Sequence, residues 1–380
     1  MINLKEYISL NRKNLTGITT EDKWWGEMYS GMRAIFYDVP TVSAQKKVFA
    51  FIGYPKTEKP ANGYPAALLI HGGNGGAFYE MARLWADRGF VTICPDFNGK
   101  YAYSINDRQR VNPDGGNAGY GAIEDLHDEN NWAYFSVLSA MRAIDVLLSL
   151  DCVDKDNIFS CGLSWGGFLQ LMLSAVDDRI KASSVIYSSA YVSESEWGKK
   201  RLENLSESDR GLWNDNIDPK NYLSDIKRPV FFTAGADDIA FKMENRRRTA
   251  ESIKAPVYFG LRKNFPHGNF IGFEQTESPE FFKRIADGKD VPKPSVTFKD
   301  GKLTVKAFDE KSELKLYYTK DDIVATETQD WAEMLISNGA TIEIEKDITA
   351  FFVTEKINDG TQWSSNLLRG DLKCQGNTKR

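Results

Sequence analysis

A serine between glycines is the first group in this sequence whose setting could do covalent chemistry. Gly162-Leu163-Ser164-Trp165-Gly166 follows the apolar run 157–161 and precedes a helix-like run. Flanking glycines permit a tight strand-to-helix turn that lifts the serine hydroxyl out of a sheet and points the next N–H at a developing oxyanion. We therefore expect Ser164 to be a nucleophile and Trp165 to donate one oxyanion-hole hydrogen bond. The alternative is a glycine-rich turn with an incidental serine.

A serine hydroxyl needs a neighbouring base at neutral pH, and the chain has three histidines. His267 follows the last expected core strand, where a loop could return it to Ser164. His127 lies in an acidic run and is typical of a solvated or helix-entry residue. His71 ends a strand that precedes the serine, which favours a loop-positioning role. We predict that His267 is the base.

The base in turn needs a carboxylate that holds its tautomer. The apolar run that starts at Val230 ends in two acidic residues, Asp237 and Asp238, and either could serve. The order serine, acid, histidine is that of α/β-hydrolases rather than of chymotrypsin or subtilisin. Asp96 precedes the serine and is expected to be structural.

A second glycine run could complete an oxyanion hole. His71-Gly72-Gly73-Asn74-Gly75-Gly76 ends an apolar strand, and its small residues would let backbone N–H groups approach a substrate oxygen. We assign the second donor to Gly73, with Asn74 as the alternative. The run lacks the G-K-[ST] ending of a nucleotide P-loop.

Composition excludes several classes of protein. The 380 residues are 42% hydrophobic and 27% charged, with a net charge of −5 and no basic stripe, so a nucleic-acid partner is not expected. The sequence has no membrane-length apolar stretch, no secretory signal and no clustered metal ligands. We expect a cytoplasmic protein with four free thiols, no metal and no cofactor.

The elements that must position these residues alternate between short strands and longer helices, which predicts a mainly parallel sheet covered by helices. The helix expected with most support spans 131–150, a polar insertion covers 188–225, and short alternating strands after Pro292 predict a small antiparallel β-sandwich. The expected domains are 1–292 and 293–380. The eight expected core strands are 33–39, 47–53, 66–70, 91–95, 158–161, 182–187, 230–234 and 257–261.

These motifs together resemble the α/β-hydrolase superfamily. The chain is most similar to the branch of prolyl-oligopeptidase-like hydrolases, dienelactone hydrolases and acetyl xylan esterases, over roughly residues 30–290. The resemblance implies an eight-stranded, mostly parallel sheet with helices on both faces, and it favours Asp238 as the acid because the family's acid commonly follows a glycine by three residues. Trp165 departs from the glutamine common in acetyl xylan esterases. About 30 residues precede the first core strand, too few for the propeller of the oligopeptidases.

We predict a serine carboxylic-ester hydrolase acting on a small acyl ester, with acetyl groups on carbohydrate as the leading case. The alternatives are a serine peptidase for short peptides and a non-catalytic binding protein of the same fold. A homo-oligomer stays open. Aromatic residues expected near the active-site loops are the remaining hint of a substrate: Tyr101, Tyr103, Tyr120, Trp132, Trp165, Trp197 and Trp213.

Overall fold

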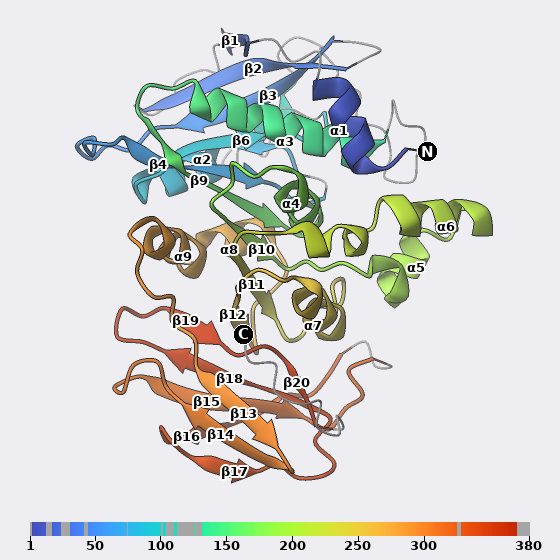
Figure 1. Ribbon diagram of the computed structural model, residues 1–380, viewed down its shortest axis with the longest axis vertical. Coiled ribbons are helices and arrows are strands. Elements are labelled where there is room, and N and C mark those ends of the chain that lie inside the picture. The colour runs from blue at the N-terminus through green and yellow to red at the C-terminus, as the bar shows by residue number, and fades with distance from the viewer. Residues whose placement is uncertain are drawn as a thin grey trace.

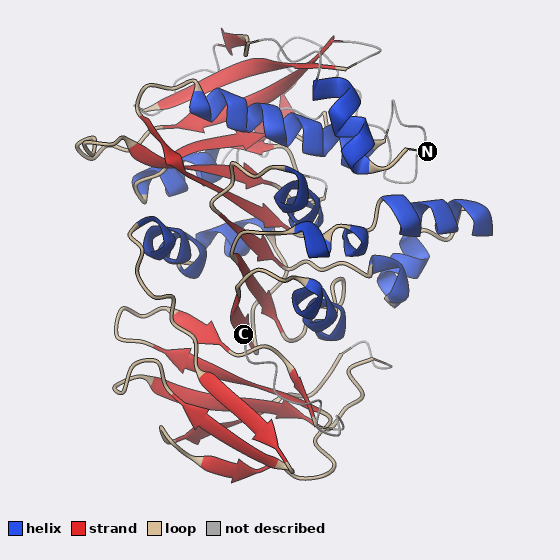
Figure 2. Cartoon of the chain, viewed as in Figure 1, coloured by secondary structure: helices blue, strands red, loops and turns tan. Residues whose placement is uncertain are grey.

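One long sheet runs through the protein and carries helices on both faces (Figures 1 and 2). It is seen in a computed structural model that describes residues 2–12, 17–23, 31–41, 45–73, 75–99, 102–103, 110–111, 126, 131–324 and 328–370. The strand order begins β1-β2-β3-β6-β4-β9-β10-β11-β12. Neighbouring strands of the run β6-β4-β9-β10-β11-β12 are parallel, whereas β1, β2 and β3 pair antiparallel at one end, and β3 pairs antiparallel with β6.

All eight expected core strands are present. Most are one or two residues longer than expected, β6 has the expected bounds, β10 ends one residue earlier, and β9 begins five residues earlier and ends two later. The strand β1 had no clear sequence signal because its residues are all polar. The parallel strands are buried along almost their whole length, which explains their continuous apolar runs. The strands are β1 Thr20–Lys23, β2 Met32–Pro40, β3 Gln45–Gly53, β4 Tyr64–Ile70, β6 Val91–Pro95, β9 Val153–Leu163, β10 Ala182–Ile186, β11 Val230–Gly235 and β12 Val257–Arg262.

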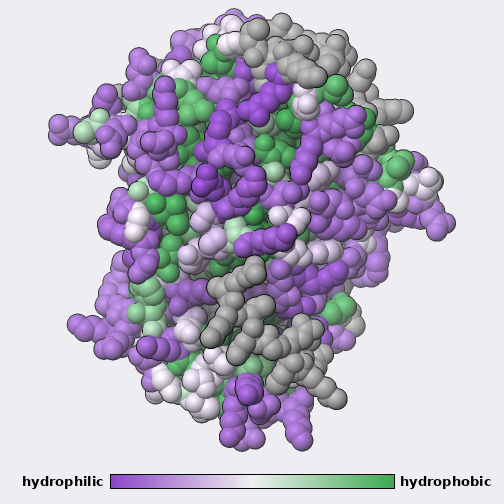
Figure 3. All heavy atoms as spheres, in the orientation of Figure 1, coloured by the Kyte–Doolittle hydropathy of each residue, from purple (hydrophilic) through white to green (hydrophobic). Residues whose placement is uncertain are grey.

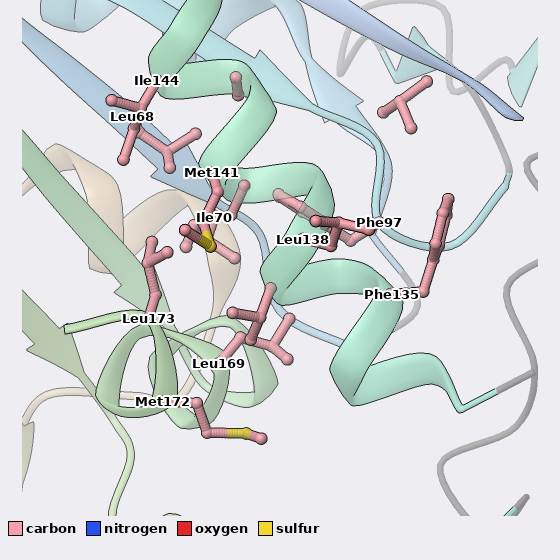
Figure 4. Close-up of a cluster of buried hydrophobic side chains, with 14 of the residues drawn as sticks. Leu68, Ile70, Phe97, Phe135, Leu138, Met141, Ile144, Leu169, Met172 and Leu173 are labelled. Carbon is pink, nitrogen blue, oxygen red and sulfur yellow. The ribbon is translucent and has the colours of Figure 1, made fainter. Parts of the chain in front are cut away.

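Helix α3, Trp132–Leu148, confirms the predicted long helix. The side chain of Asn131 caps it by accepting from the Tyr134 N–H at 3.0 Å. The helix is buried on nearly every face because it lies between the sheet and its neighbouring helices. In Figure 4, Met141 of this helix lies among Ile70 of β4 and Leu169 of α4 (Trp165–Val176). Truncating such a side chain to alanine costs about 2 to 5 kcal/mol.

Helices α1, α3 and α4 contribute to the core on one face of the sheet, and α2, α8 and α9 to the core on the other. The predicted insertion at 188–225 is folded as short helices. Among the described residues, none of the helices is long and apolar enough to span a membrane. The remaining helices are α1 Leu4–Arg12, α2 Tyr79–Asp87, η1 Val192–Glu194, α5 Glu196–Arg201, α6 Glu207–Asn216, η2 Pro219–Asn221, η3 Leu223–Asp225, α7 Met243–Ser252, α8 Asn269–Glu274 and α9 Glu277–Ala286.

The C-terminal strands form two packed sheets, as the alternating pattern predicted. One sheet is β13-β14-β17, and the other is β19-β18-β15-β16 with β20 beside β18. Leu303, Val305, Leu316, Phe351 and Val353 fill the space between them. The strands are β13 Ser295–Lys299, β14 Lys302–Lys306, β15 Glu313–Thr319, β16 Ala332–Ile336, β17 Thr341–Glu343, β18 Ala350–Lys356, β19 Gln362–Ser364 and β20 Leu368–Arg369.

The larger of these sheets is continuous with the hydrolase sheet, because β19 pairs with β12 through Ser364 and Phe259. Tyr317 and Phe352 of the sandwich also share a core with Met243 of α7. The sequence pattern did not show this continuity. A separate small three-stranded sheet pairs β7 (Ala102–Tyr103) with β5 (Ala77–Phe78) on one side and β8 (Arg110–Val111) on the other.

Candidate active site

Ser164 occupies a strained turn between β9 and α4. Its φ of 56° and ψ of −121° put a non-glycine residue in a region that costs about 1 to 3 kcal/mol. Its N–H donates to the Ile186 carbonyl at 2.8 Å, which ties the turn to β10. A Cβ on Gly162 would collide with the Gly166 carbonyl across the turn, and a Cβ on Gly166 would collide with the Ile70 carbonyl at the end of β4, so close packing requires both glycines of the motif.

The imidazole of His267 lies between Ser164 and Asp238. Its Nε2 is 2.8 Å from Ser164 Oγ, and its Nδ1 is 3.2 and 3.3 Å from the two oxygens of Asp238. The ring stacks with Tyr187, with centroids 4.9 Å apart, and with Phe241, with centroids 6.3 Å apart. These two aromatic rings fix the plane in which the imidazole lies.

Asp238 is the predicted acid that meets His267. It follows β11, is buried, and accepts backbone hydrogen bonds from Ala240 at 3.0 Å and Phe241 at 3.2 Å. Asp237, its competitor in the sequence, is exposed. Of the two carboxylates, Asp238 is therefore the one placed to orient the histidine.

The two predicted oxyanion donors belong to residues that pack against each other, Trp165 and Gly73. The N–H of Trp165 belongs to the first turn of α4, where helix geometry leaves it without a partner inside the helix. Gly73 packs on the same residue, since a Cβ added to it would lie 2.7 Å from Trp165 Cδ1. Asn74, the alternative donor, lies outside the described residues.

Hydrogen bonds to both the N–H and the carbonyl of Gly72 hold the loop that carries Gly73. The Gly72 N–H donates to Asn269 Oδ1 at 3.2 Å, and Nδ1 of the buried His71 donates to the Gly72 carbonyl at 2.7 Å. His71 Nε2 accepts from the Phe97 N–H at 2.8 Å, which defines the neutral tautomer of the ring. His71 thus positions the loop, as expected, while His127 lies outside the described residues.

Several aromatic residues surround the site. Trp165 contacts Trp132, Trp197 and Phe241, with ring centroids 6.2, 5.3 and 6.0 Å away. Trp213 is fully buried against Phe168 and is a core residue, which corrects its expected place near the active-site loops. The side chains of Tyr101, Tyr103 and Tyr120 lie outside the described part of the chain.

A groove of about 550 Å³ opens beside these rings. Trp197 and the exposed Ile239, which follows the acid Asp238, provide its apolar surface. Its other walls are charged side chains, and Lys199 is paired with Glu196 at 2.7 Å. The lining residues are Glu196, Trp197, Lys199, Lys200, Glu203, Ile239 and Lys242. The face drawn in Figure 3 is mostly hydrophilic, with hydrophobic residues in small separate areas.

Four residues of the site had no sequence signal. Tyr187 and Phe241 lie in loops with no motif, and Asn269 is the first residue of α8. Arg246, whose Nη2 lies 3.5 Å from Asp238 Oδ2, belongs to the run Arg246-Arg247-Arg248, which suggests a solvated helix face. Among the described residues, no group of three His, Cys, Asp or Glu side chains could hold a metal ion. Burial raises the pKa of the Cys94 and Cys161 thiols to about 12, so both stay protonated near neutral pH.

Solved structures with the same fold include two acetyl xylan esterases. That of Paenibacillus sp. R4 has 16% identity and a TM-score of 0.54, with 76% of this chain and 93% of that chain covered. Acetyl xylan esterase 1 of Thermoanaerobacterium sp. JW/SL YS485 has 18% identity and a TM-score of 0.53, with 74% and 92% covered. At such identities the likeness shows the α/β-hydrolase fold alone.

Curated relatives match over a shorter segment. A probable dipeptidyl-peptidase 5 of Emericella nidulans is 31% identical over 131 residues, which are 32% of this chain and 16% of that protein. A probable dipeptidyl-peptidase 5 of Trichophyton verrucosum is 26% identical over 168 residues, 42% of this chain and 21% of that protein. This chain therefore matches only about a fifth of the length of these relatives.

The model of the dienelactone hydrolase family matches residues 50–268, more than half of the chain. This segment contains the serine turn, the buried carboxylate and the histidine that meet at the ends of β9, β11 and β12. The chain belongs to the dienelactone hydrolase family and is a hydrolase of the α/β-hydrolase superfamily.

Proposed function

We propose that this protein is a serine hydrolase that cleaves small acyl esters through an acyl-enzyme. The observation that carries the proposal is the line of contacts from Ser164 Oγ through His267 to Asp238, at 2.8 and 3.2 Å. A base 2.8 Å from a hydroxyl is within the range needed to accept its proton. A strained turn that presents this hydroxyl, together with N–H groups beside it, supports the same chemistry.

In the proposed mechanism, Ser164 Oγ attacks the ester carbonyl carbon while His267 Nε2 accepts the hydroxyl proton. Asp238 holds the Nδ1 proton and stabilises the imidazolium without taking its proton. The N–H groups of Trp165 and Gly73 donate to the oxyanion. The imidazolium then protonates the leaving alkoxide, and water, activated by the same histidine, releases the acid from the serine.

The proposed substrate is an acetyl ester on a carbohydrate. The groove beside Trp165 supports this choice, because Trp197 provides an aromatic surface for a sugar ring and the charged side chains around it can hydrogen-bond to hydroxyl groups. A small acyl group would lie among Trp165, Phe241 and Trp132. The fold shared with two acetyl xylan esterases agrees with this substrate class.

A peptidase acting on short peptides is the second candidate, favoured by the identity shared with dipeptidyl-peptidase 5 proteins. The two candidates differ in the leaving group, since an amine needs protonation in the transition state more than an alkoxide does. We expect kcat/KM for p-nitrophenyl acetate and an acetylated xylo-oligosaccharide to exceed that for an alanyl-arylamide. Arylamide turnover equal to that of the acetate would assign the protein to the peptidases instead.

The nucleophile is tested by Ser164→Ala and His267→Ala. Each is expected to reduce p-nitrophenyl acetate hydrolysis by several orders of magnitude while leaving the melting temperature nearly unchanged. The remaining activity should be about a thousandfold above water, because the oxyanion donors stay in place. Near wild-type turnover in Ser164→Ala would refute the proposed function.

A further inference from the structure

A charged side chain lies buried directly behind the proposed triad. Arg246 of α7 lies with its Nη2 3.5 Å from Oδ2 of Asp238. The Arg246 side chain is 2% exposed and the Asp238 side chain is 1% exposed. The same nitrogen donates to the Phe241 carbonyl at 2.8 Å, and Nη1 lies 3.0 Å from Met243 Sδ. The guanidinium therefore touches both the acid and the loop residue that stacks on His267.

Burial makes this arrangement costly, which argues that the charge has a role. An isolated buried cation is strongly disfavoured, and partial compensation requires a nearby anion. Of the described carboxylates, Asp238 is the one within 4 Å of Arg246. Burial lowers the pKa of Arg246 to about 10, so the side chain is still cationic near neutral pH.

The next residue on the helix shows how an arginine without such a role is placed. Arg247 pairs with Glu244 at 2.8 Å and with Glu251 at 2.6 Å, on the outer side of α7. Packing alone would be satisfied at position 246 by an apolar side chain of similar size, and replacing a buried ion pair in that way is often neutral or stabilising.

We propose that Arg246 is a positioning residue of the triad: it contacts Oδ2 of Asp238, and its positive charge acts on the Asp238–His267 pair. This inference rests on the proposed function, in which His267 is the base. The bond from Arg246 to the Phe241 carbonyl extends the same hold to the ring that covers His267. One side chain thus fixes the acid and one face of the base together.

The sign of the electrostatic effect follows from the groups that face Asp238. His267 approaches from the loop after β12, Arg246 from α7, and Tyr187 from the end of β10. Asp237, which precedes Asp238 in the turn after β11, is exposed. Burial raises the pKa of Tyr187, so this residue stays neutral. The positive charge of Arg246 opposes protonation of His267, and its removal should make the imidazole more basic.

The test replaces Arg246 by methionine, which removes the charge, and by lysine, which keeps it. Arg247→Met is the matched control on the same helix. For each protein we would record kcat/KM for p-nitrophenyl acetate against pH, and the titration of His267 by NMR with labelled histidine. The chain has three histidines, so its spectrum is simple to assign. NMR needs no substrate, and therefore separates failure of this inference from failure of the proposed function.

In Arg246→Met the midpoint of the His267 titration and the acidic limb of kcat/KM should both rise by about one pH unit. Turnover at the plateau should fall about tenfold, because the acid and the Phe241 ring lose their hold. Arg246→Lys should restore the midpoint, and Arg247→Met should match the wild type. An unchanged midpoint in Arg246→Met would overturn the inference, even if activity fell.

If Arg246→Met alone does not fold, the comparison moves to Asp238→Asn with and without Arg246→Met. The double variant leaves no unpaired buried charge and should be the more stable of the two. Removal of the arginine should again raise the His267 midpoint by about one pH unit. A midpoint equal in the two proteins would overturn the inference by the same reasoning.

Discussion

Substitution of Gly166 tests whether close packing of the serine turn against the end of β4 sets the geometry of the site. A Cβ on this residue would lie 2.5 Å from the His71 carbonyl oxygen and 2.8 Å from the Ile70 carbonyl carbon, and nearer still to the Ile70 carbonyl oxygen. Non-bonded atoms prefer separations of about 3.5 Å. Both obstacles are backbone at the end of β4 and cannot rotate away. In Gly166→Ala, α4 and β4 must therefore separate by about 1 Å.

This displacement has a calculable effect on stability and on activity. Overpacking of this kind costs about 1 to 3 kcal/mol, and the better helix propensity of alanine returns up to about 1 kcal/mol. The net cost is therefore at most about 3 kcal/mol, and for a chain of 380 residues the melting temperature should fall by no more than about 4 °C. Because α4 carries the Trp165 N–H and the β4 loop carries Gly73, a shift of about 1 Å would also widen the proposed oxyanion site. We expect kcat/KM to fall about a hundredfold.

The measurement is p-nitrophenyl acetate hydrolysis beside a thermal melt followed by circular dichroism. Gly211→Ala in α6 is the control, since a Cβ there meets no atom within 4 Å. It should retain wild-type activity and gain up to about 1 kcal/mol of stability. Wild-type kcat/KM in Gly166→Ala would refute the argument that this contact sets the geometry of the oxyanion site.

Three further substitutions test the proposed roles of individual side chains. Asp238→Asn should lower kcat by about a thousandfold or more and Asp237→Asn by less than about threefold, so an equal loss would contradict the assignment of the acid. Asn269→Ala removes the acceptor of the Gly72 N–H and should lower kcat about tenfold with KM nearly constant; a rise in KM alone would point to substrate binding instead. Trp197→Ala should raise KM for an acetylated oligosaccharide about tenfold but leave p-nitrophenyl acetate nearly unaffected, and equal effects on both substrates would remove the sugar-stacking role.

The local sequence was enough to predict the hydrolase core and the positions of its chemistry. Continuous apolar runs of four to six residues predicted the buried parallel strands, because both faces of such strands are covered. The glycines around Ser164 predicted the strand-to-helix turn, since only small residues fit where the backbone crosses itself closely. Chain order and strand ends then indicated His267 and the pair Asp237 and Asp238.

Tertiary structure decided which of two chemically identical neighbours meets the histidine. Asp237 and Asp238 have the same side chain and the same local sequence, and the turn after β11 buries one and exposes the other. The positions of Arg246 and Asn269 likewise depend on contacts with residues far along the chain, 197 residues in the case of Gly72 and Asn269. The continuity of the two sheets rests on one antiparallel pairing between Phe259 and Ser364, which no local pattern encodes. Local periodicity and turn stereochemistry thus determined which elements form, whereas pairing and burial across the chain decided which side chains lie together.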